Sequence, residues 1–190
     1  ETGLMTSGAF SNKARSPQYR IAIFQHNSKG FRDNATLKQD DTNKKDELTA
    51  RAKFRFWAGE DTQLDLTLLH ANLNNGYDAY SPENTFTTFS DQPGKDTQET
   101  YAGAFKVTYS GWATADLIAT SSYAYSDMLY SFDLDWAAAA QDFSANKKKR
   151  KNLSQEVRLV SKQPIFNAST DWLAGIYAAR LEEDNHLDDT

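Results

Sequence analysis

The stretch from Glu47 to His70 constrains the fold of this chain more than any other. In its first half, Glu47 to Trp57, apolar side chains alternate with cationic or polar ones. Because successive side chains of a strand point to opposite faces, this half predicts a strand with one apolar and one charged face. The second half, Gln63 to His70, repeats the alternation after a short acidic turn that contains Gly59. The sequence therefore predicts a β-hairpin.

The two faces of this hairpin differ sharply in chemistry. In the first strand the apolar face carries Leu48, Ala50, Ala52, Phe54 and Phe56, and the other face carries Thr49, Arg51, Lys53 and Arg55. The cationic side chains need water or oppositely charged partners. The apolar face needs either a protein core or lipid, and the rest of the sequence must decide between the two.

Composition favours a β protein with wide polar surfaces. Aromatic residues make up 13% of the 190 residues although only 39% are hydrophobic, and disordered chains lack such an aromatic content. No helical period is sustained, and no apolar run approaches the roughly 20 residues that a membrane-spanning helix needs. The sequence starts without Met or a recognisable leader, so we expect either a removed leader or a piece of a longer chain.

The residues that carry most enzyme and metal chemistry are sparse or scattered. The net charge of -5 argues against nucleic acid as a partner, and cysteine is absent. His26, His70 and His186 lack the spacing of metal ligands. No acid-base or nucleophile constellation can be placed, so we expect no enzyme activity, no catalytic residue, no metal and no cofactor.

About eight strands are predicted, joined by connections of unequal length. The long loops are expected at Asn27 to Asp46, Asn74 to Gln98 and Asp127 to Asn152, and the last of these holds the basic cluster Lys147 to Lys151. Short turns alternate with them, and the acidic tail Leu181 to Thr190 is expected to begin another loop. The pattern predicts an all-β, antiparallel up-and-down meander with its long loops at one end, which is the layout of outer-membrane barrels.

A lipid-facing surface and a protein core make different demands on the apolar face. A charge facing lipid costs roughly 2 to 4 kcal/mol at the midplane, and the faces Leu48 to Phe56, Leu64 to Leu68 and Tyr101 to Tyr109 are free of charges. Aromatic residues gather near strand ends, as in the girdles at the two membrane interfaces. The alternative is that these aromatics cap the core of a soluble sheet.

Four segments resemble the barrel of TonB-dependent receptors, the outer-membrane active transporters of Gram-negative bacteria. They are Tyr19–Ala22 with Asn27–Asn34, Leu48–Trp57, Asn75–Tyr80 with Ser90–Asp96, and Gln155–Ser161 with Trp172–Tyr177. Lys29 departs from the pattern, since Asp is common there. Their order and spacing cover nearly the whole chain.

The resemblance implies that residues 1–190 form part of a 22-stranded barrel in the bacterial cell outer membrane, with no plug domain in this sequence. Such a receptor imports a scarce nutrient, for example a ferric siderophore, through contact between its plug and a TonB-type energy-transducing protein. Its partners would then be a small-molecule chelate, that protein and outer-membrane lipid. The alternative is a soluble all-β module that binds a glycan or another ligand.

The candidate ligand-binding residues lie in the second long loop. They are Tyr77, Asp78, Tyr80, Phe86 and Phe89. Aromatic side chains in a polar loop either pack locally or meet a ligand, because an extracellular ring can hold a chelate, a glycan or a planar group by stacking. The sequence leaves both roles open.

Overall fold

The chain folds into one long antiparallel sheet with a small second sheet at one end. The structure is a computed structural model that describes residues 1–139, 142–166 and 169–189. Its strands are β1 (Thr2–Ala9), β2 (Gln18–Ser28), β3 (Arg32–Asn34), β4 (Gln39–Thr42), β5 (Lys45–Ala58), β6 (Thr62–Tyr77), β7 (Thr87–Thr88), β8 (Gly94–Tyr109), β9 (Ala115–Asp133), β10 (Phe143–Ser161) and β11 (Leu173–Asp189). In the described ranges no helix is long and apolar enough to cross a membrane.

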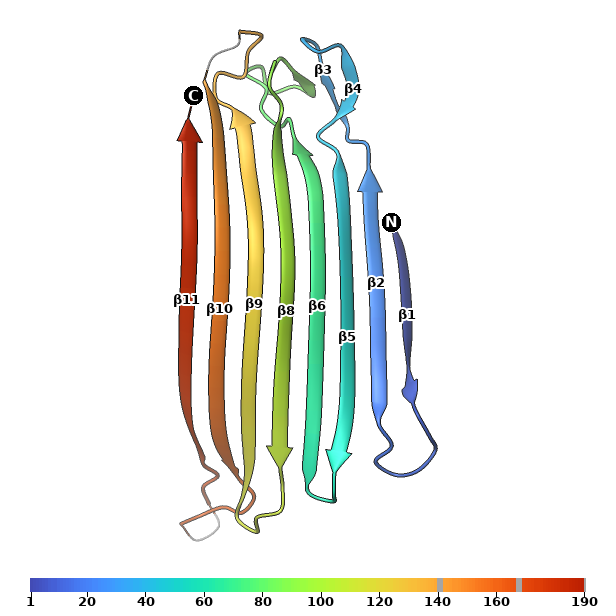
Figure 1. Ribbon diagram of the computed structural model, residues 1–190, viewed down its shortest axis with the longest axis vertical. Helices are drawn as coiled ribbons and strands as arrows, with labels where there is room; N and C mark the ends of the chain where they lie inside the picture. Colours follow the sequence, from blue (N-terminus) through green and yellow to red (C-terminus); the bar gives the residue numbers. More distant parts are fainter. Residues whose placement is uncertain (140–141, 167–168, 190) are drawn as a thin grey trace.

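The large sheet has eight strands in the order β1-β2-β5-β6-β8-β9-β10-β11, and every neighbouring pair is antiparallel. Each strand pairs with the large-sheet strand that precedes it in sequence, which makes an up-and-down meander (Figure 1). The predicted all-β, antiparallel class is therefore confirmed. β3, β4 and β7 form the small sheet inside the connections at one end.

Two predicted loop regions are strand instead. β9 and β10 run through most of the expected loop Asp127 to Asn152, so the basic cluster Lys147 to Lys151 lies in β10. The expected acidic loop after Leu181 belongs to β11, and Thr190 lies outside the described residues. The physical reason is lateral pairing. Glu183 accepts hydrogen bonds of 2.8 and 2.6 Å from Arg150 and lies 3.3 Å from Lys148, so these polar strands stabilise each other without apolar alternation.

The connections at the two ends of the sheet are unequal, although less regularly than predicted. The connections 29–44 and 78–93 lie at one end together with 134–142 (Figure 1). The connection 134–142 is shorter than 162–172 at the opposite end, so the third predicted long loop is wrong. We call the end with 29–44, 78–93 and 134–142 the loop end.

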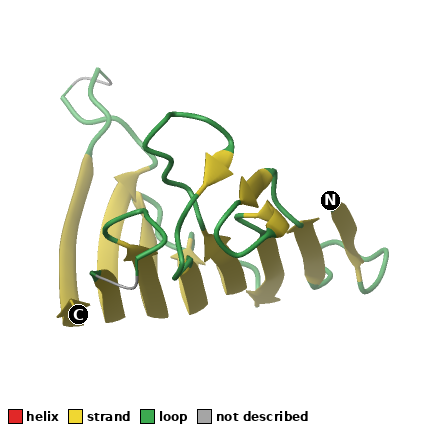
Figure 2. Cartoon of the chain, turned by 90° about the horizontal axis from the view of Figure 1, so that it is seen from above, coloured by secondary structure: helices red, strands yellow, loops and turns green. Residues whose placement is uncertain are grey.

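The eight strands of the large sheet form a single layer (Figure 2). Among the described residues the only buried apolar side chain is that of Ala115. The accessible surface is 12418 Å², whereas a compact globular protein of this mass exposes about 9,100 Å². Large apolar side chains such as Ile176 remain 79% exposed. The apolar side chains of this sheet are therefore not covered by other parts of the described chain.

Register places apolar side chains from each of the eight strands on one common face. Phe54 pairs with Leu66, and Leu66 pairs with Phe105 on its other side. The same face continues to Ile23 and Leu4 on one flank, and to Val157 and Ile176 on the other. Because residues directly opposite each other share a face, these side chains form one band, which we call the apolar band.

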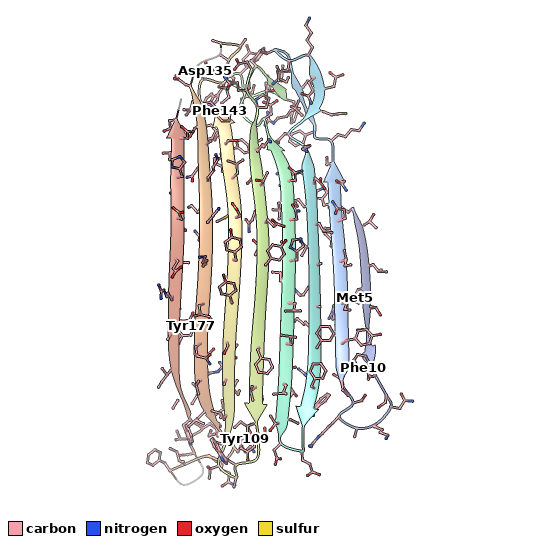
Figure 3. The ribbon with its side chains drawn as sticks, viewed as in Figure 1. Met5, Phe10, Tyr109, Asp135, Phe143 and Tyr177 are labelled. Atoms are coloured by element: carbon pink, nitrogen blue, oxygen red, sulfur yellow. The ribbon has the colours of Figure 1, made fainter. Side chains whose placement is uncertain are left out.

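Along β8 the apolar band is bounded by aromatic rings. On the loop side Tyr101 stacks on His70 at 4.6 Å between ring centroids, and at the short-turn end Tyr109 meets Trp112 edge-on at 5.5 Å. Figure 3 shows Tyr109 at that end and Asp135 and Phe143 at the loop end. The eight residue steps from Tyr101 to Tyr109 span about 26 Å along the strand.

The opposite face of the sheet carries charged side chains together with apolar ones such as Phe24 and Leu69. It carries Arg51, Lys53 and Arg55 of β5, and the Arg55 guanidinium donates to the Asp65 carboxylate of β6 at 2.6 Å. The difference between the faces that the opening hairpin predicted continues in β8, whereas β11 places Arg180 on the side of the apolar band and Tyr177 and Leu181 on the opposite side. We call this side the charged face.

Candidate functional site

The small sheet joins the first two connections of the loop end. β3 pairs in parallel with β7, and the backbone amides of Asp33 and Ala35 donate to the carbonyls of Phe86 and Thr88 at 3.1 and 2.9 Å. The connection 78–93 is in turn tied to 134–142, because the Asp91 amide donates to the Ala137 carbonyl at 3.1 Å. The three connections therefore form one layer at the loop end.

A buried polar network fixes this layer. The side-chain amide of Asn34 donates to the Asp78 carboxylate at 3.1 Å and to the Ser90 carbonyl at 2.8 Å. The Thr88 hydroxyl donates to the same Asp78 oxygen at 2.9 Å, and the Leu37 amide donates to the Asn34 side-chain oxygen at 2.9 Å. Asn34 and Thr88 are almost completely buried, as is Asp78 at 4% exposure. Asp78 is thus a structural anchor between the first two connections.

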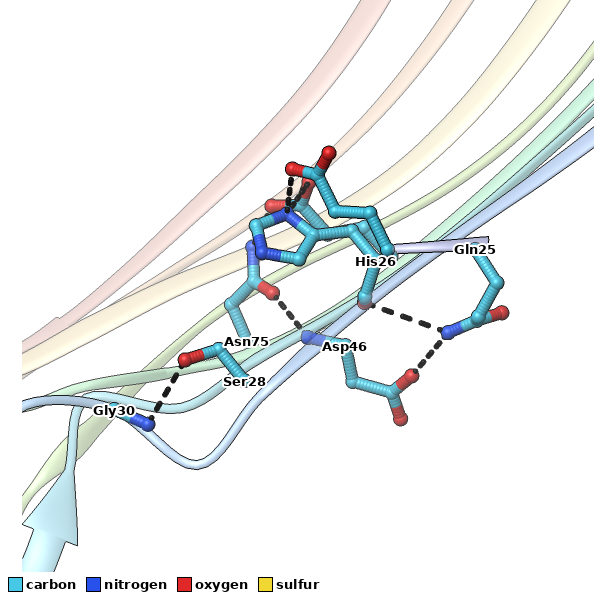
Figure 4. A network of polar contacts seen from close by, with 8 residues as sticks. Gln25, His26, Ser28, Gly30, Asp46 and Asn75 are labelled. Atoms are coloured by element: carbon cyan, nitrogen blue, oxygen red, sulfur yellow. Dashed lines mark hydrogen bonds and ion pairs between the residues drawn. The ribbon is translucent and has the colours of Figure 1, made fainter. Parts of the chain in front are cut away.

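A second network joins the loop layer to the strands beneath it (Figure 4). The Asn75 side chain accepts from the Asp46 amide at 2.9 Å and donates to the Glu47 carboxylate at 2.8 Å. The Asp46 carboxylate accepts from Gln25 at 2.8 Å, and His26 lies 3.9 Å from Glu47. Because these residues come from β2, β5 and β6, the base of the loop layer is held to three strands.

Five aromatic rings cluster beside the first network. Tyr80 stacks on Trp136 with centroids 4.7 Å apart and ring planes 14° from parallel. Tyr77 meets Tyr130 edge-on at 4.9 Å and Tyr80 at 5.8 Å. Phe132 lies within 6 Å of both Tyr80 and Tyr130. We call these five rings the aromatic cluster. Tyr80 and Trp136 are 38% and 37% exposed, so the cluster offers ring surface to solvent.

The aromatic cluster lies on the charged face of the sheet. Tyr77 is on the same side of β6 as Asp65, because the two are separated by an even number of residues. Tyr130 is directly opposite Asp96 of β8 and shares the side of β9 that carries Phe132. Since Tyr80 and Trp136 contact these rings from the connections, the loop layer folds over the charged face and leaves the apolar band uncovered.

A buried carboxyl and a buried hydroxyl lie among these rings. Asp133 is 4% exposed and Ser90 is 6% exposed. One oxygen of Asp133, Oδ1, accepts from the amides of Asp135 and Trp136 at 3.1 and 3.2 Å. Among the described residues, Asp133 Oδ2 and Ser90 Oγ complete no hydrogen bond. Trp136 has a φ of 56°, a left-handed conformation that is strained for a tryptophan.

Burial changes the acidity of this cluster. Removal from water raises the pKa of Asp133 above its ordinary value, and nearby Asp135 raises this pKa further, while the approach of Ser90 lowers it. Burial also raises the pKa of Tyr77. Asp133 and Tyr77 lie beyond the apolar band, in the loop end. Burial therefore favours the neutral phenol of Tyr77 and disfavours the ionised form of Asp133.

A larger groove lies on the other side of Tyr77 and Asp78. It has a volume of about 450 Å³ and is lined mainly by the first connection, including Lys29, Asp41 and Lys44. A volume of this size suits a small molecule. Tyr77 and Asp78 thus separate a mixed-charge groove from the aromatic cluster.

The structure divides the five candidate residues. It brings Tyr77, Asp78 and Tyr80 together at the cluster. Phe86 lies apart, edge-on to Phe31 at 5.7 Å, and Phe89 is half-buried with its carbonyl accepting from the Thr36 hydroxyl at 2.5 Å. No described ring contact links Phe86 or Phe89 to the cluster.

Sequence reasoning missed the other half of the cluster. Tyr130, Phe132 and Trp136 complete it, with Asp133 and Ser90 between the rings. The available signal was the run Phe132 to Trp136, in which aromatic and acidic residues alternate around Leu134. The sequence predicted that this run lies in a loop, and nothing in the sequence indicated that it would contact Tyr77.

Comparison with known proteins does not assign the chain to a family. No family model matches the chain, and neither the curated proteins nor the solved structures include a significant match.

Proposed function

We propose that the chain is part of the barrel of a TonB-dependent receptor in the bacterial outer membrane, which takes up a scarce nutrient such as a ferric siderophore. The eight strands would continue into a closed barrel, of 22 strands in that family. A plug elsewhere in the protein would contact the TonB-type energy-transducing protein. The loop end would face outward and hold the ligand before import, so the chemistry is binding and gating.

The observation that carries this proposal is the uncovered apolar band. A single-layered sheet that exposes apolar side chains on one face across all eight strands is unstable in water. A bilayer covers such a face, and the distance of about 26 Å between the bounding rings along the strand is close to the apolar height of outer-membrane barrels, about 25 Å. A soluble binding module would need a second layer over this face, and the described residues supply none.

The charged face and the loop layer support the same proposal. In a large barrel the inward face is polar, and loops fold inward over the lumen. Here the loop layer lies over the charged face, where Tyr77 and Tyr130 emerge from the strands. Both open edges, β1 and β11, would be paired by further strands in a closed barrel.

The test compares two neighbouring residues of β8 on opposite faces. Phe105 lies in the apolar band opposite Leu66 and Ser121, and Ala104 lies on the charged face opposite Thr67 and Ser122. Neither residue has a charged residue directly opposite. We expect Phe105→Lys to lower the free energy of unfolding in detergent by about 2 to 4 kcal/mol, and Ala104→Lys to change it by less than about 1 kcal/mol.

Circular dichroism and heat-dependent gel mobility report folding, with Phe105→Leu as the control for loss of the ring. Equal effects of Phe105→Lys and Ala104→Lys would remove the distinction between a lipid face and a lumen face. Cooperative folding of the unmodified chain in plain buffer would replace the membrane proposal with the soluble binding module.

A further inference from the structure

The gap inside the aromatic cluster has the size and chemistry of a site for one small polar group. It has a volume of about 10 Å³, about the room that one water-sized group needs. Its walls include the rings of Tyr77, Tyr80 and Trp136. Asp133 and Ser90 also line it, and each is more than nine-tenths buried with an oxygen that has no partner among the described residues.

The two connections that form this gap carry only negative charge. The connection 78–93 contains Asp78, Glu83 and Asp91 but no Lys or Arg. The connection 134–142 contains Asp135 and Asp142 and likewise no Lys or Arg. The faces of the rings add further negative electrostatic potential. The charged residues that line the gap, Asp78 and Asp133, are both acidic, so this site favours a cationic group over an anionic one.

We propose that this gap binds the primary ammonium group of an organic ligand, with the rest of the ligand lying over Tyr80 and Trp136. The ammonium would donate to Asp133 Oδ2 and Ser90 Oγ and contact the ring faces. Its charge would offset the cost of burying the carboxylate, which is the cause of the raised pKa of Asp133. A fully anionic chelate without an amine would be excluded.

This inference deepens the proposed function, because it names the charge of the ligand that the loop end would take. It rests on that function for import, although binding itself can be measured whether or not the chain enters a membrane. A bound ammonium group would give partners to Asp133 Oδ2 and Ser90 Oγ, and its charge would suit the acidic residues of the connections 78–93 and 134–142. A buried water, or donation from the Ser90 hydroxyl to Asp133, would satisfy the oxygens but would give no preference for a cation.

The experiment is a fluorescence titration of a variant in which Trp136 is the only tryptophan, made by Trp57→Phe, Trp112→Phe and Trp172→Phe. It is done in whichever medium, detergent or buffer, the chain folds. The probes are 4-aminobutan-1-ol, its neutral analogue butane-1,4-diol, and the N,N,N-trimethyl form of the amine. We expect the amine to bind at least about tenfold more tightly than the diol and the trimethyl form.

Two matched variants test whether the amine binds at Asp133. Asp133→Asn keeps the size of the side chain and an oxygen for the Asp135 and Trp136 amides, and should weaken amine binding about tenfold. Glu83→Gln removes the same charge from an exposed position outside the gap and should leave affinity within about twofold.

Equal affinity for amine and diol would overturn the proposal, as would unchanged binding by Asp133→Asn. Equal binding of the trimethyl form would show attraction to ring faces without ammonium donation, which also contradicts the proposed site. Failure to fold in detergent, with folding in buffer, would refute the barrel. If the chain folds in detergent but its Trp136 fluorescence does not change with added amine, only the ammonium site would be refuted.

Discussion

Asn34 ties the first two connections of the loop layer together. Its side chain makes three hydrogen bonds from a position that is 1% exposed, to Asp78, the Ser90 carbonyl and the Leu37 amide. Asn34→Ala leaves the buried Ser90 carbonyl and the partly buried Leu37 amide without partners, and the Asp78 carboxylate retains only Thr88. A hydrogen bond to a charged group contributes about 1.5 to 3 kcal/mol and a neutral one about 1 kcal/mol, so we expect a loss of about 4 kcal/mol.

This loss should be local, because Asn34 contacts the loop layer rather than the large sheet. The assay is amide hydrogen exchange of the folded chain, read at the amides of Asp33 and Ala35, which cross between the first two connections. A loss of about 4 kcal/mol speeds exchange by on the order of a thousandfold, or until the layer is fully open. Exchange in the middle of β8 should not change.

Asn74→Ala is the matched control, since Asn74 is an exposed asparagine of β6, and it should leave exchange within about threefold. Asn34→Asp should destabilise the layer as strongly as Asn34→Ala, because it removes both donors and sets a second carboxylate against Asp78. Unchanged protection at Ala35 would refute the assigned role of the network. Equal loss of protection throughout β8 would refute its local character.

Two further predictions concern the base of the loop layer. Gly94→Ala places a Cβ in a clash with the Ser131 carbonyl oxygen, so we expect urea unfolding in detergent to show a loss of about 3 kcal/mol. Gly103→Ala, whose nearest contact is 3.6 Å, should cost under about 1 kcal/mol, and equal costs would contradict the close approach at Gly94. The raised pKa of Asp133 means that the folded chain holds this proton more tightly than the unfolded chain. Its stabilising contribution is therefore present below the unfolded pKa of about 3.9 and lost as pH rises through the raised folded value. Unfolding followed by Trp136 fluorescence should show that Asp133→Asn removes this decline, and an identical pH profile for the variant would contradict it.

The polar parts of β10 and β11 could not be predicted as strands from the sequence. The alternation of Leu48 to Phe56 identifies a strand by itself, because period two is a local property of one chain segment. Lys147 to Lys151 has no apolar alternation, and its strand exists because β9 and β11 supply ladder partners and Glu183 supplies a charge for Arg150. These partners lie outside the segment, so its own sequence predicted a loop.

The sequence by itself determined the all-β class, the two chemically different faces and the residues near one half of the aromatic cluster, because alternation and composition are written along the chain. Only the tertiary structure decided that Tyr77 and Tyr80 meet Tyr130 and Trp136, since the registers of β6, β8 and β9 bring those strand ends together. It also decided that Asp78 is an anchor and Asp133 a buried carboxyl. Whether an acidic side chain is solvated or buried depends on the neighbours that folding places around it, and a local pattern does not contain them.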